Sequence, residues 1–515
     1  MILDDTPDRL GPLADGTAAA LGELAERDAV ARTWAGDHTL WRDDPTEISD
    51  RLGWLTVGPD MAARLDTLGA RTARLADGVD HVLLAGMGGS SLFPEVVARS
   101  GASEAAAPAL TVLDTTDPAA IARLGAELDP SRTLHLAASK SGSTLETRSH
   151  LAWAWDRHPD PARFAVITDP GSDLAALAAE RGFADTFENP PDLGGRYSAL
   201  SLFGLVPALL AGTDVEGLLA SAATMADRLR AAPAANPAAR LAAAVAAGVR
   251  AGRDKLTVVV PDDQATFGLW LEQLIAESTG KEGTGVVPIV GERLGDPAAY
   301  GDDRLFVSLG DGTETAALAA LAAAGHPVAV IPFAGGFADL GGQVLLWELA
   351  TALVGALLGI QPFDQPDVAA AKAATAQVLA AGPPAIEPTP LADLLDQVRP
   401  GDYLAIQAFV DPGGPAVPAV EAARVALRDR LRVATTVGLG PRFLHSTGQL
   451  HKGGPDTGVF VQVVGDDPAD VAIPGADYGF RTLIHAQADG DLLTLHDRKR
   501  RAGRVRLDEL TEVTP

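Results

Sequence analysis

Hydroxyl side chains gather at one predicted strand-to-helix junction, in the run 139–147. Ser139, Ser141, Ser143 and Thr144 lie within six residues, and Lys140 stands between the first two. Hydroxyl donors combined with the free N–H groups of a helix N-terminus suit a phosphate monoester. The spacing is not that of a Walker loop, which disfavours nucleotide hydrolysis. A plain helix cap is the alternative, although a cap needs only one hydroxyl.

Two glycine-rich turns add candidate binding groups. The run 86–91 follows a predicted strand and opens a helix, so its backbone can approach a ligand closely. Residue 91 is Ser91, where a dinucleotide fingerprint needs glycine, and a simple tight turn is the alternative. The run 194–198 places Arg196 beside two glycines at a helix start. There it can hold negative charge, although a surface arginine is also compatible.

Candidate acid–base groups lie further along the chain. Gln273 and Glu277 are four residues apart and share a helix face, and Gly280 is the predicted helix stop. Glu277 then lies in the last turn, where the helix dipole disfavours an anion and favours a proton acceptor. Pro366 suits the first turn of a new helix that carries Lys372. The alternatives are a solvated helix glutamate and a lysine that extends along an apolar face to water.

Two of the ten histidines, His445 and His451, lie six residues apart in a polar, glycine-rich loop. Loops rich in Gly, His, Lys and Gln form sites more often than cores. The histidine spacing matches no common zinc pattern, and the chain contains no cysteine. We therefore expect no metal site, no disulfide and no cysteine nucleophile.

The candidate site residues must be positioned by the strands and helices of the fold. The sequence shows these elements as short apolar runs that alternate with helical stretches. From about residue 80 this alternation predicts parallel α/β sheets covered by helices. The first 60 residues look helical and carry Trp34, Trp41 and Trp54, which predicts a packing arm. The predicted regions are a helical arm at 1–60, α/β domains at 61–230 and 231–385, and a C-terminal α/β region at 386–515. The predicted strands are 81–85, 109–113, 133–138, 164–168, 255–260, 286–290, 305–309, 328–332, 403–410, 432–436, 459–464 and 480–485.

Composition narrows the class of protein. The 515 residues carry a net charge of −27, which argues against broad binding to nucleic acid or anionic membranes. With 47% apolar and 21% charged residues, the chain is globular. No secretory signal pattern opens it, and the apolar stretches 241–249 and 345–360 are shorter than a membrane span. We expect these stretches to be buried helices in a soluble, cytoplasmic protein.

Taken in order, these motifs resemble the glucose-6-phosphate isomerase family between about residues 34 and 372. The NPFDQP-type segment of bacterial members resembles 361–366. The other matches are 88–90 for the family's GGS loop, 139–147 for its phosphate loop, 194–198 for its GGR[YF]S signature, Gln273 with Glu277 for its base helix, and Gln365 with Lys372 for its final lysine.

The resemblance implies two SIS-type doubly wound parallel-sheet domains plus the C-terminal α/β region. It also implies a homodimer that needs no cofactor and isomerises aldose to ketose through a cis-enediol. Glu277 would move the proton between C2 and C1, and Arg196 would stabilise the enediolate. The implied substrate-binding residues are Gly89, Ser90, Ser139, Lys140, Ser141, Thr144, Gln273 and Gln365.

Two departures from the family pattern bear on the site. Many members have ESNGK where this chain has EST, Gly280 and Lys281. The ring-opening histidine normally lies between the base helix and the final lysine, where this chain has only His326, in a Gly-His-Pro setting. The region after 390 is more similar to the isomerase half of bacterial transaldolase–glucose-6-phosphate isomerase fusions. We therefore assign ring opening to His451 with Lys372, with His445 and His326 as reserves.

Two other functions remain open at this point. One is a dual glucose/mannose-6-phosphate isomerase, because stereochemistry at C2 cannot be inferred from these motifs. The other is a non-catalytic SIS regulator that binds a phosphosugar. Such a regulator would need neither Glu277 nor Lys372, so the presence of both, each with a glutamine partner, favours the enzyme.

Overall fold

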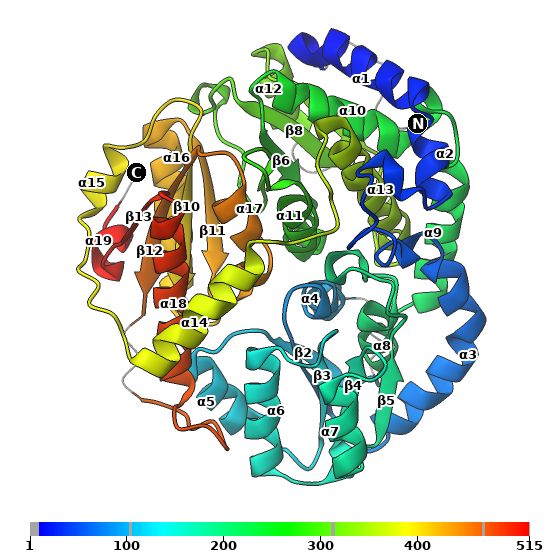
Figure 1. Ribbon diagram of the computed structural model, residues 1–515, viewed down its shortest axis with the longest axis vertical. Coiled ribbons are helices and arrows are strands. Elements are labelled where there is room, and N and C mark those ends of the chain that lie inside the picture. The colour runs from blue at the N-terminus through cyan, green and yellow to red at the C-terminus, as the bar shows by residue number, and fades with distance from the viewer. Residues whose placement is uncertain (1–9, 102–105, 311–314, 466–468, 514–515) are drawn as a thin grey trace.

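Three parallel sheets form the framework of the molecule in the computed structural model, which describes residues 10–101, 106–310, 315–465 and 469–513 (Figure 1). The sheets have the strand orders β2-β1-β3-β4-β5, β7-β6-β8-β9 and β11-β10-β12-β13. The predicted α/β class with parallel sheets is therefore confirmed. Each sheet lies inside one predicted α/β region, while the domain boundaries themselves stay predictions. The strands are β1 His81–Gly86, β2 Ala109–Leu113, β3 Thr133–Ala138, β4 Phe164–Thr168, β5 Asp185–Glu188, β6 Lys255–Val259, β7 Val287–Ile289, β8 Arg304–Leu309, β9 Val328–Ile331, β10 Tyr403–Phe409, β11 Ala434–Leu439, β12 Gly458–Val464 and β13 Arg501–Arg504.

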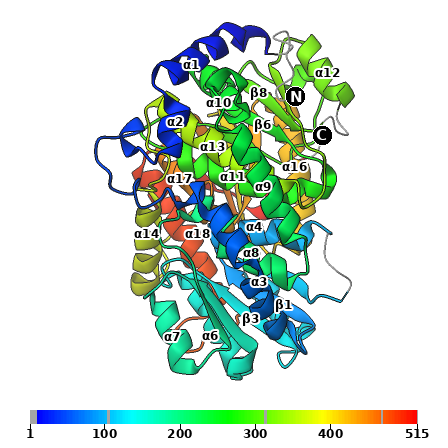
Figure 2. The same cartoon turned by 90° about the vertical axis from the view of Figure 1, so that its right-hand side faces the viewer.

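The sheets are covered by helices, as parallel sheets require because both of their faces are apolar. The longest described helices in the second half are α13, which is buried along its whole length, and α18, which packs along α14 (Figures 1 and 2). The helices are α1 Ala14–Glu26, α2 Ala29–Trp34, α3 Val57–Ala76, α4 Leu92–Arg99, α5 Pro118–Glu127, α6 Leu145–Arg157, α7 Asp173–Arg181, α8 Leu202–Leu210, α9 Val215–Arg228, α10 Pro237–Arg250, α11 Ala265–Thr279, α12 Thr315–Ala323, α13 Leu340–Leu358, α14 Val368–Ala381, α15 Leu391–Leu395, α16 Ala416–Leu431, α17 Gly448–Gly453, α18 Phe480–Asp497 and α19 Leu507–Thr511.

The N-terminal tryptophans pack the arm onto the body, as predicted. Trp41 is buried and donates from Nε1 to the carbonyl of Ala352 on α13 (2.8 Å). Trp54 is buried against the ring of Tyr197, with centroids 5.4 Å apart. By length and composition α13 is a candidate membrane span, but in this structure it is a core helix, as expected for the apolar stretch 345–360.

Two features of the structure differ from the prediction. Residues 480–485 begin the long helix α18 and form no strand. This six-residue stretch mixes three apolar with three polar residues, and so short a stretch does not distinguish a strand from the start of a helix. Here the 18-residue length of α18 decides. The prediction also missed β5 and β13. Both are edge strands of four residues, Asp-Thr-Phe-Glu and Arg-Ala-Gly-Arg, and neither contains an apolar run.

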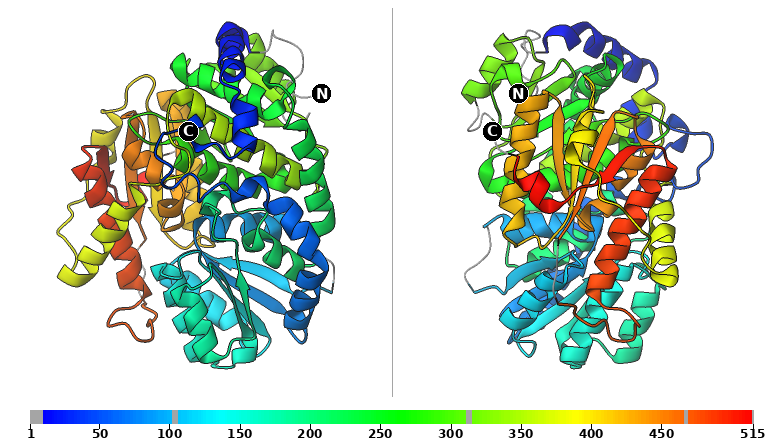
Figure 3. Two further views of the ribbon diagram at one scale, coloured as in Figure 1. Left: turned by 45° about the vertical axis from the view of Figure 1, so that its right-hand side comes forward. Right: turned by 90° about the vertical axis from the view of Figure 1, so that its left-hand side faces the viewer.

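The third sheet and its helices lie beside the first two sheets and their helices (Figures 1 and 3). α17 contacts α11, and the short helix η11 (Arg442–His445) contacts η5 (Gly88–Ser90). Segments from all three sheet regions therefore meet at one junction.

Candidate active site

The glycine loop after β1 is packed against protein groups on two sides. Gly88 has φ +56°, and a Cβ there would stand 2.8 Å from both Gln273 Nε2 and the carbonyl oxygen of His445. A Cβ on Gly89 would stand 1.8 Å from the carbonyl oxygen of Gly195. These glycines are needed because four chain segments converge here. Ser90, the third residue of this motif, is buried at the same turn.

The hydroxyl-rich loop joins β3 to α6. Ser139 is buried, and its Oγ lies 3.0 Å from Thr144 Oγ1 and accepts from the N–H of Gly142. Ser141 is exposed, with its Oγ 2.9 Å from Ser143 Oγ. Thr144 is the N-cap residue of α6 but makes no side-chain capping hydrogen bond. The plain-cap alternative is therefore not realised, and the start of α6 keeps N–H groups that suit an anion.

Lys140 forms an ion pair and a hydrogen bond with neighbouring loops. Its Nζ lies 2.5 Å from Asp169 Oδ2 and donates to the carbonyl of Pro191 (2.8 Å). The pKa of Asp169 is raised, because burial outweighs the hydrogen bond from Lys140. Lys140 thus stabilises the loop that carries the hydroxyls.

Arg196 is buried in η7 (Gly195–Tyr197), and its guanidinium joins the base helix to the segment 361–366. Nε donates to Ser278 Oγ (2.8 Å), and Nη1 lies 3.4 Å from Glu277 Oε1. Nη2 donates to the carbonyls of Pro362 (2.7 Å) and Asp364 (2.9 Å). One cation therefore fixes two of the predicted site segments and faces the predicted base.

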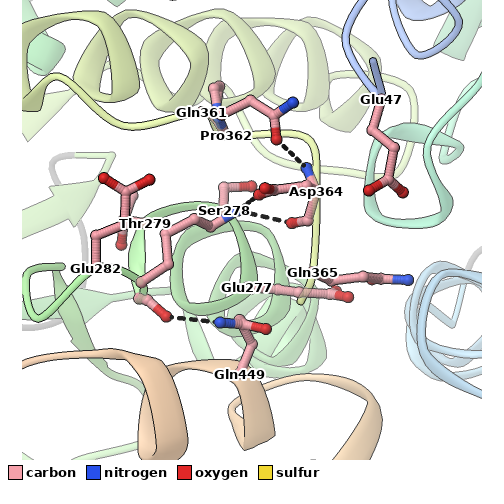
Figure 4. A network of polar contacts seen from close by, with 12 residues as sticks. Glu47, Glu277, Ser278, Thr279, Glu282, Gln361, Pro362, Asp364, Gln365 and Gln449 are labelled. Carbon is pink, nitrogen blue, oxygen red and sulfur yellow. Dashed lines mark hydrogen bonds and ion pairs between the residues drawn. The ribbon is translucent and has the colours of Figure 1, made fainter. Parts of the chain in front are cut away.

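Glu277 lies near the end of α11, which stops at Gly280 as predicted. Gln273 Nε2 donates both to Glu277 Oε2 (3.1 Å) and to the carbonyl of His445 (2.9 Å). Figure 4 shows Glu277 beside Gln365, and Gln365 Oε1 lies 3.4 Å from Arg196 Nη1. The structure thus brings Gln273, Glu277, Arg196 and Gln365 together.

Lys281 also anchors the segment 361–366, a role the sequence reasoning did not assign. Its buried Nζ donates to the carbonyl and to Oδ1 of Asp364, both at 2.6 Å. Burial and the charge of Arg196 lower the pKa of Lys281 to about 8, against the opposing effect of Asp364. Gln449 on α17 donates to the carbonyl of Gly280 (3.1 Å), so the C-terminal region supports the end of the same helix (Figure 4).

Lys372 is not brought into this network. It is exposed on α14, and within the described parts of the chain it makes no hydrogen bond or ion pair with Arg196, Glu277 or Gln365. Its predicted role in ring opening stays a prediction.

The placement of His451 argues against proton exchange with a substrate. Its ring is 3% exposed and lies among Tyr403, Phe443 and Phe460, with Nδ1 3.2 Å from Gln407 Nε2. Burial holds the pKa of His451 well below its usual range, and the charges of neighbouring cations lower it further. A neutral histidine hydrogen-bonded in a core is the simpler interpretation.

The two reserve histidines differ in position. His326 packs near Tyr300 and Phe306, with Nε2 3.2 Å from the carbonyl of Pro297, at the second sheet. His445 lies in η11, and its carbonyl receives the hydrogen bond from Gln273 described above. Its Nε2 lies 2.9 Å from Glu146 Oε1. Within the described residues, His445 is the one of the three histidines that hydrogen-bonds to the network of the predicted base, and it does so through its backbone carbonyl.

Glu146 is the residue that sequence reasoning missed, although it lies inside the run 139–147. It is buried in the first turn of α6, where the helix dipole favours an anion. Burial alone would raise its pKa, but the charge of His445 and the hydrogen bond from it hold the pKa at about 2. The sequence feature that could have identified Glu146 is its position as a carboxylate within a hydroxyl-rich run.

Comparison with known proteins shows to which family the chain belongs. Residues 62–302 match the family model described as phosphoglucose isomerase. A glucose-6-phosphate isomerase of Rubrobacter xylanophilus is 32% identical over 356 residues, covering 58% of this chain and 82% of the relative. One of Thermus thermophilus is 30% identical over 394 residues, covering 65% and 91%.

Two solved structures share the fold. A hypothetical protein of Thermus thermophilus has a TM-score of 0.60 at 26% identity, covering 72% of this chain and 99% of that one. A glucose-6-phosphate isomerase of Chlamydia trachomatis has a TM-score of 0.58 at 19% identity, covering 71% and 86%. The relatives and the site define an aldose–ketose isomerase. The chain belongs to the phosphoglucose isomerase family.

Proposed function

We propose that the protein interconverts glucose 6-phosphate and fructose 6-phosphate through a cis-enediol, as a step of glycolysis and gluconeogenesis. The observation that carries the proposal is the position of Glu277, a buried carboxylate between the guanidinium of Arg196 and the amide of Gln273. Isomerisation needs one base that takes a proton from one carbon and returns it to its neighbour. It also needs a fixed cation for the enediolate, which Arg196 supplies.

The hydroxyl loop would hold the phosphate and set the register of the sugar over Glu277. Ser139, Ser141 and Thr144 would donate hydrogen bonds, and the uncapped N–H groups of α6 would add the helix dipole. Gln365 would contact the sugar from the segment that Arg196 and Lys281 hold in place.

Ring opening is best assigned to His445. Because a carboxylate only accepts hydrogen bonds, Glu146 selects the tautomer of His445 that carries its proton on Nε2. Nδ1 is then left to exchange a proton with the ring oxygen or the anomeric hydroxyl. Lys372 remains the proposed partner in this step, although it would have to reach the site from the surface of α14.

A coupled assay that converts fructose 6-phosphate and detects glucose 6-phosphate tests the proposal. Glu277→Gln preserves the shape of the side chain and removes its basicity, so turnover should fall by at least about 100-fold. Folded Glu277→Gln protein that keeps more than a tenth of wild-type activity would exclude Glu277 as the base. Mannose 6-phosphate, assayed in parallel, distinguishes a dual isomerase, and binding without turnover would indicate a regulator.

We also propose a close relation to the isomerase half of bacterial transaldolase–isomerase fusions. The loop with His445 and Gln449, on which that resemblance was based, contacts the base helix.

A cytoplasmic homodimer that binds neither nucleic acid nor membranes is the proposed working state. The resemblance supports the dimer, and the net charge of −27 supports the absence of polyanion binding. Light scattering after size-exclusion chromatography should give twice the chain mass of 53.0 kDa. A single-chain mass would refute the dimer.

A further inference from the structure

The carboxylate that orients His445 has a second donor, on a helix of the C-terminal region. Glu146 Oε1 accepts from Gln487 Nε2 (2.7 Å) as well as from His445 Nε2 (2.9 Å). Gln487 lies on α18, and its side chain is buried. The carboxylate oxygen is therefore held between two N–H donors from separate elements.

The amide of Gln487 is itself held in one orientation. Thr116, in the loop after β2, donates from Oγ1 to Gln487 Oε1 (2.6 Å). Because the carboxylate can only accept, the amide nitrogen must face Glu146, and its oxygen then faces the Thr116 hydroxyl. The result is a chain of hydrogen bonds from Thr116 through Gln487 to Glu146, which also receives His445.

We propose that Gln487 is a positioning residue for ring opening, an inference that rests on the proposed isomerase function. Gln487 aligns Glu146 and keeps it an acceptor, and Glu146 in turn fixes the tautomer and the direction of the His445 ring. Gln487 acts through Glu146 and has no hydrogen bond to Glu277, Arg196 or Gln273 within the described residues. Loss of its amide should therefore slow ring opening and spare the proton transfer at C1 and C2.

This inference gives the C-terminal region a function in the reaction. Glu146 and Thr116 belong to the first sheet region, whereas His445 and Gln487 belong to the third. The region 386–515 would thus supply His445, which opens the ring, and Gln487, which aligns Glu146. It would bring both to a site built on the first two sheet regions.

Two substrates separate ring opening from isomerisation. Fructose 6-phosphate must be opened first, whereas 5-deoxyfructose 6-phosphate lacks the hydroxyl that closes the ring and enters as the open chain. For Gln487→Met, which preserves volume and removes the amide, we expect kcat on fructose 6-phosphate to fall about 10- to 100-fold with little change in KM. The acyclic substrate should be turned over within about threefold of wild type.

Gln487→Glu gives an independent readout, because it places a second carboxylate against Glu146. Activity on fructose 6-phosphate should be low at neutral pH and should recover in part as the pH falls, since one shared proton restores a donor. Among the described residues, the other titratable or charged groups around the pair include His445, His150 one turn along α6, and Asp114 with its partner Arg442. Wild-type protein, measured over the same pH range, corrects for their titration.

Gln462→Met is the matched control. Gln462 is also buried in the C-terminal region. It donates to the carbonyl of Ala488 on the same helix and accepts from Arg504, but among the described residues it has no hydrogen bond to Glu146. Gln462→Met should leave the ratio of activity on fructose 6-phosphate to activity on 5-deoxyfructose 6-phosphate unchanged. The inference is overturned if Gln487→Met lowers both activities equally, or lowers neither. Failure of the proposed function itself would appear separately, as a wild-type protein that turns over neither substrate.

Discussion

Arg196→Lys tests whether the shape of the guanidinium, beyond its charge, builds the site. Arg196 donates to Ser278, to the carbonyl of Pro362 and to the carbonyl of Asp364, at 2.7–2.9 Å. A lysine ammonium at the end of an unbranched chain can replace about one of these three contacts. Hydrogen bonds from a charged donor contribute about 1.5–3 kcal/mol each, so losing two should cost about 3 kcal/mol or more.

Part of this cost should appear as lost catalysis. The cation near Glu277 would move, and the segment that carries Gln365 would lose two of its anchors. We expect kcat/KM for fructose 6-phosphate to fall about 100-fold, which corresponds to about 2.7 kcal/mol of transition-state stabilisation. Urea unfolding and the coupled assay measure the two effects on the same preparation.

Arg424→Lys is the matched control for this substitution. Arg424 is also buried and donates to the carbonyls of Thr435 (3.1 Å) and Val290 (2.8 Å), and among the described residues it has no hydrogen bond to Glu277, Ser278 or the segment 361–366. Arg424→Lys should lose about as much free energy of unfolding as Arg196→Lys and keep kcat/KM within about threefold of wild type. The reasoning is refuted if Arg196→Lys keeps more than a third of wild-type kcat/KM, or if the control loses as much activity.

Three further outcomes are expected. Ser139→Ala combined with Thr144→Ala should raise KM about 5- to 100-fold through lost hydrogen bonds to phosphate. An unchanged KM in steady-state kinetics would mean that the loop only caps helix α6 and does not bind phosphate. His445→Ala should lower turnover of fructose 6-phosphate at least about 50-fold and leave turnover of the acyclic substrate unchanged. His451→Ala should mainly lower the midpoint of thermal unfolding. The reverse pattern would restore His451 as the ring-opening residue. Because the pKa of Glu146 is lowered to about 2 on folding, its ionisation stabilises the protein fully above the unfolded value of about 4.5, and this contribution is lost as the pH falls toward 2. The stability advantage of wild type over Glu146→Gln in urea unfolding should therefore shrink between pH 4.5 and 2, and a pH-independent difference would contradict the lowered pKa.

Most strands and turns of this fold could be predicted because their signals are local. The run Phe164–Thr168 forms the predicted strand, and helix α11 ends at Gly280 where a stop was expected. The start of α18 was predicted as a strand, because a six-residue stretch with three apolar side chains does not reveal whether the element continues. β13 was missed, because its Arg501–Arg504 sequence carries no apolar run and pairs only at a sheet edge.

Spacing along one element also identified much of the candidate site. Gln273 and Glu277 face the same way because they are four residues apart on one helix, and this relation needs no tertiary information. The hydroxyls of 139–144 are adjacent in the chain, so their clustering was certain once the turn was recognised. The role of Lys372 cannot be decided in this way, since it depends on how α14 is placed relative to the site.

Only tertiary packing distinguishes the environments of the two histidines in this loop. His445 and His451 belong to the same loop, and the sequence by itself determined only that two histidines stand there, close to Gln449. When η11 and α17 pack onto the first and third sheet regions, His451 enters an aromatic core beside Gln407, and His445 meets Glu146. Glu146 comes from 299 residues earlier in the chain, and Gln487 from 341 residues after Glu146. Contacts over such separations follow from the shape and burial of whole elements, so no local pattern could have selected them.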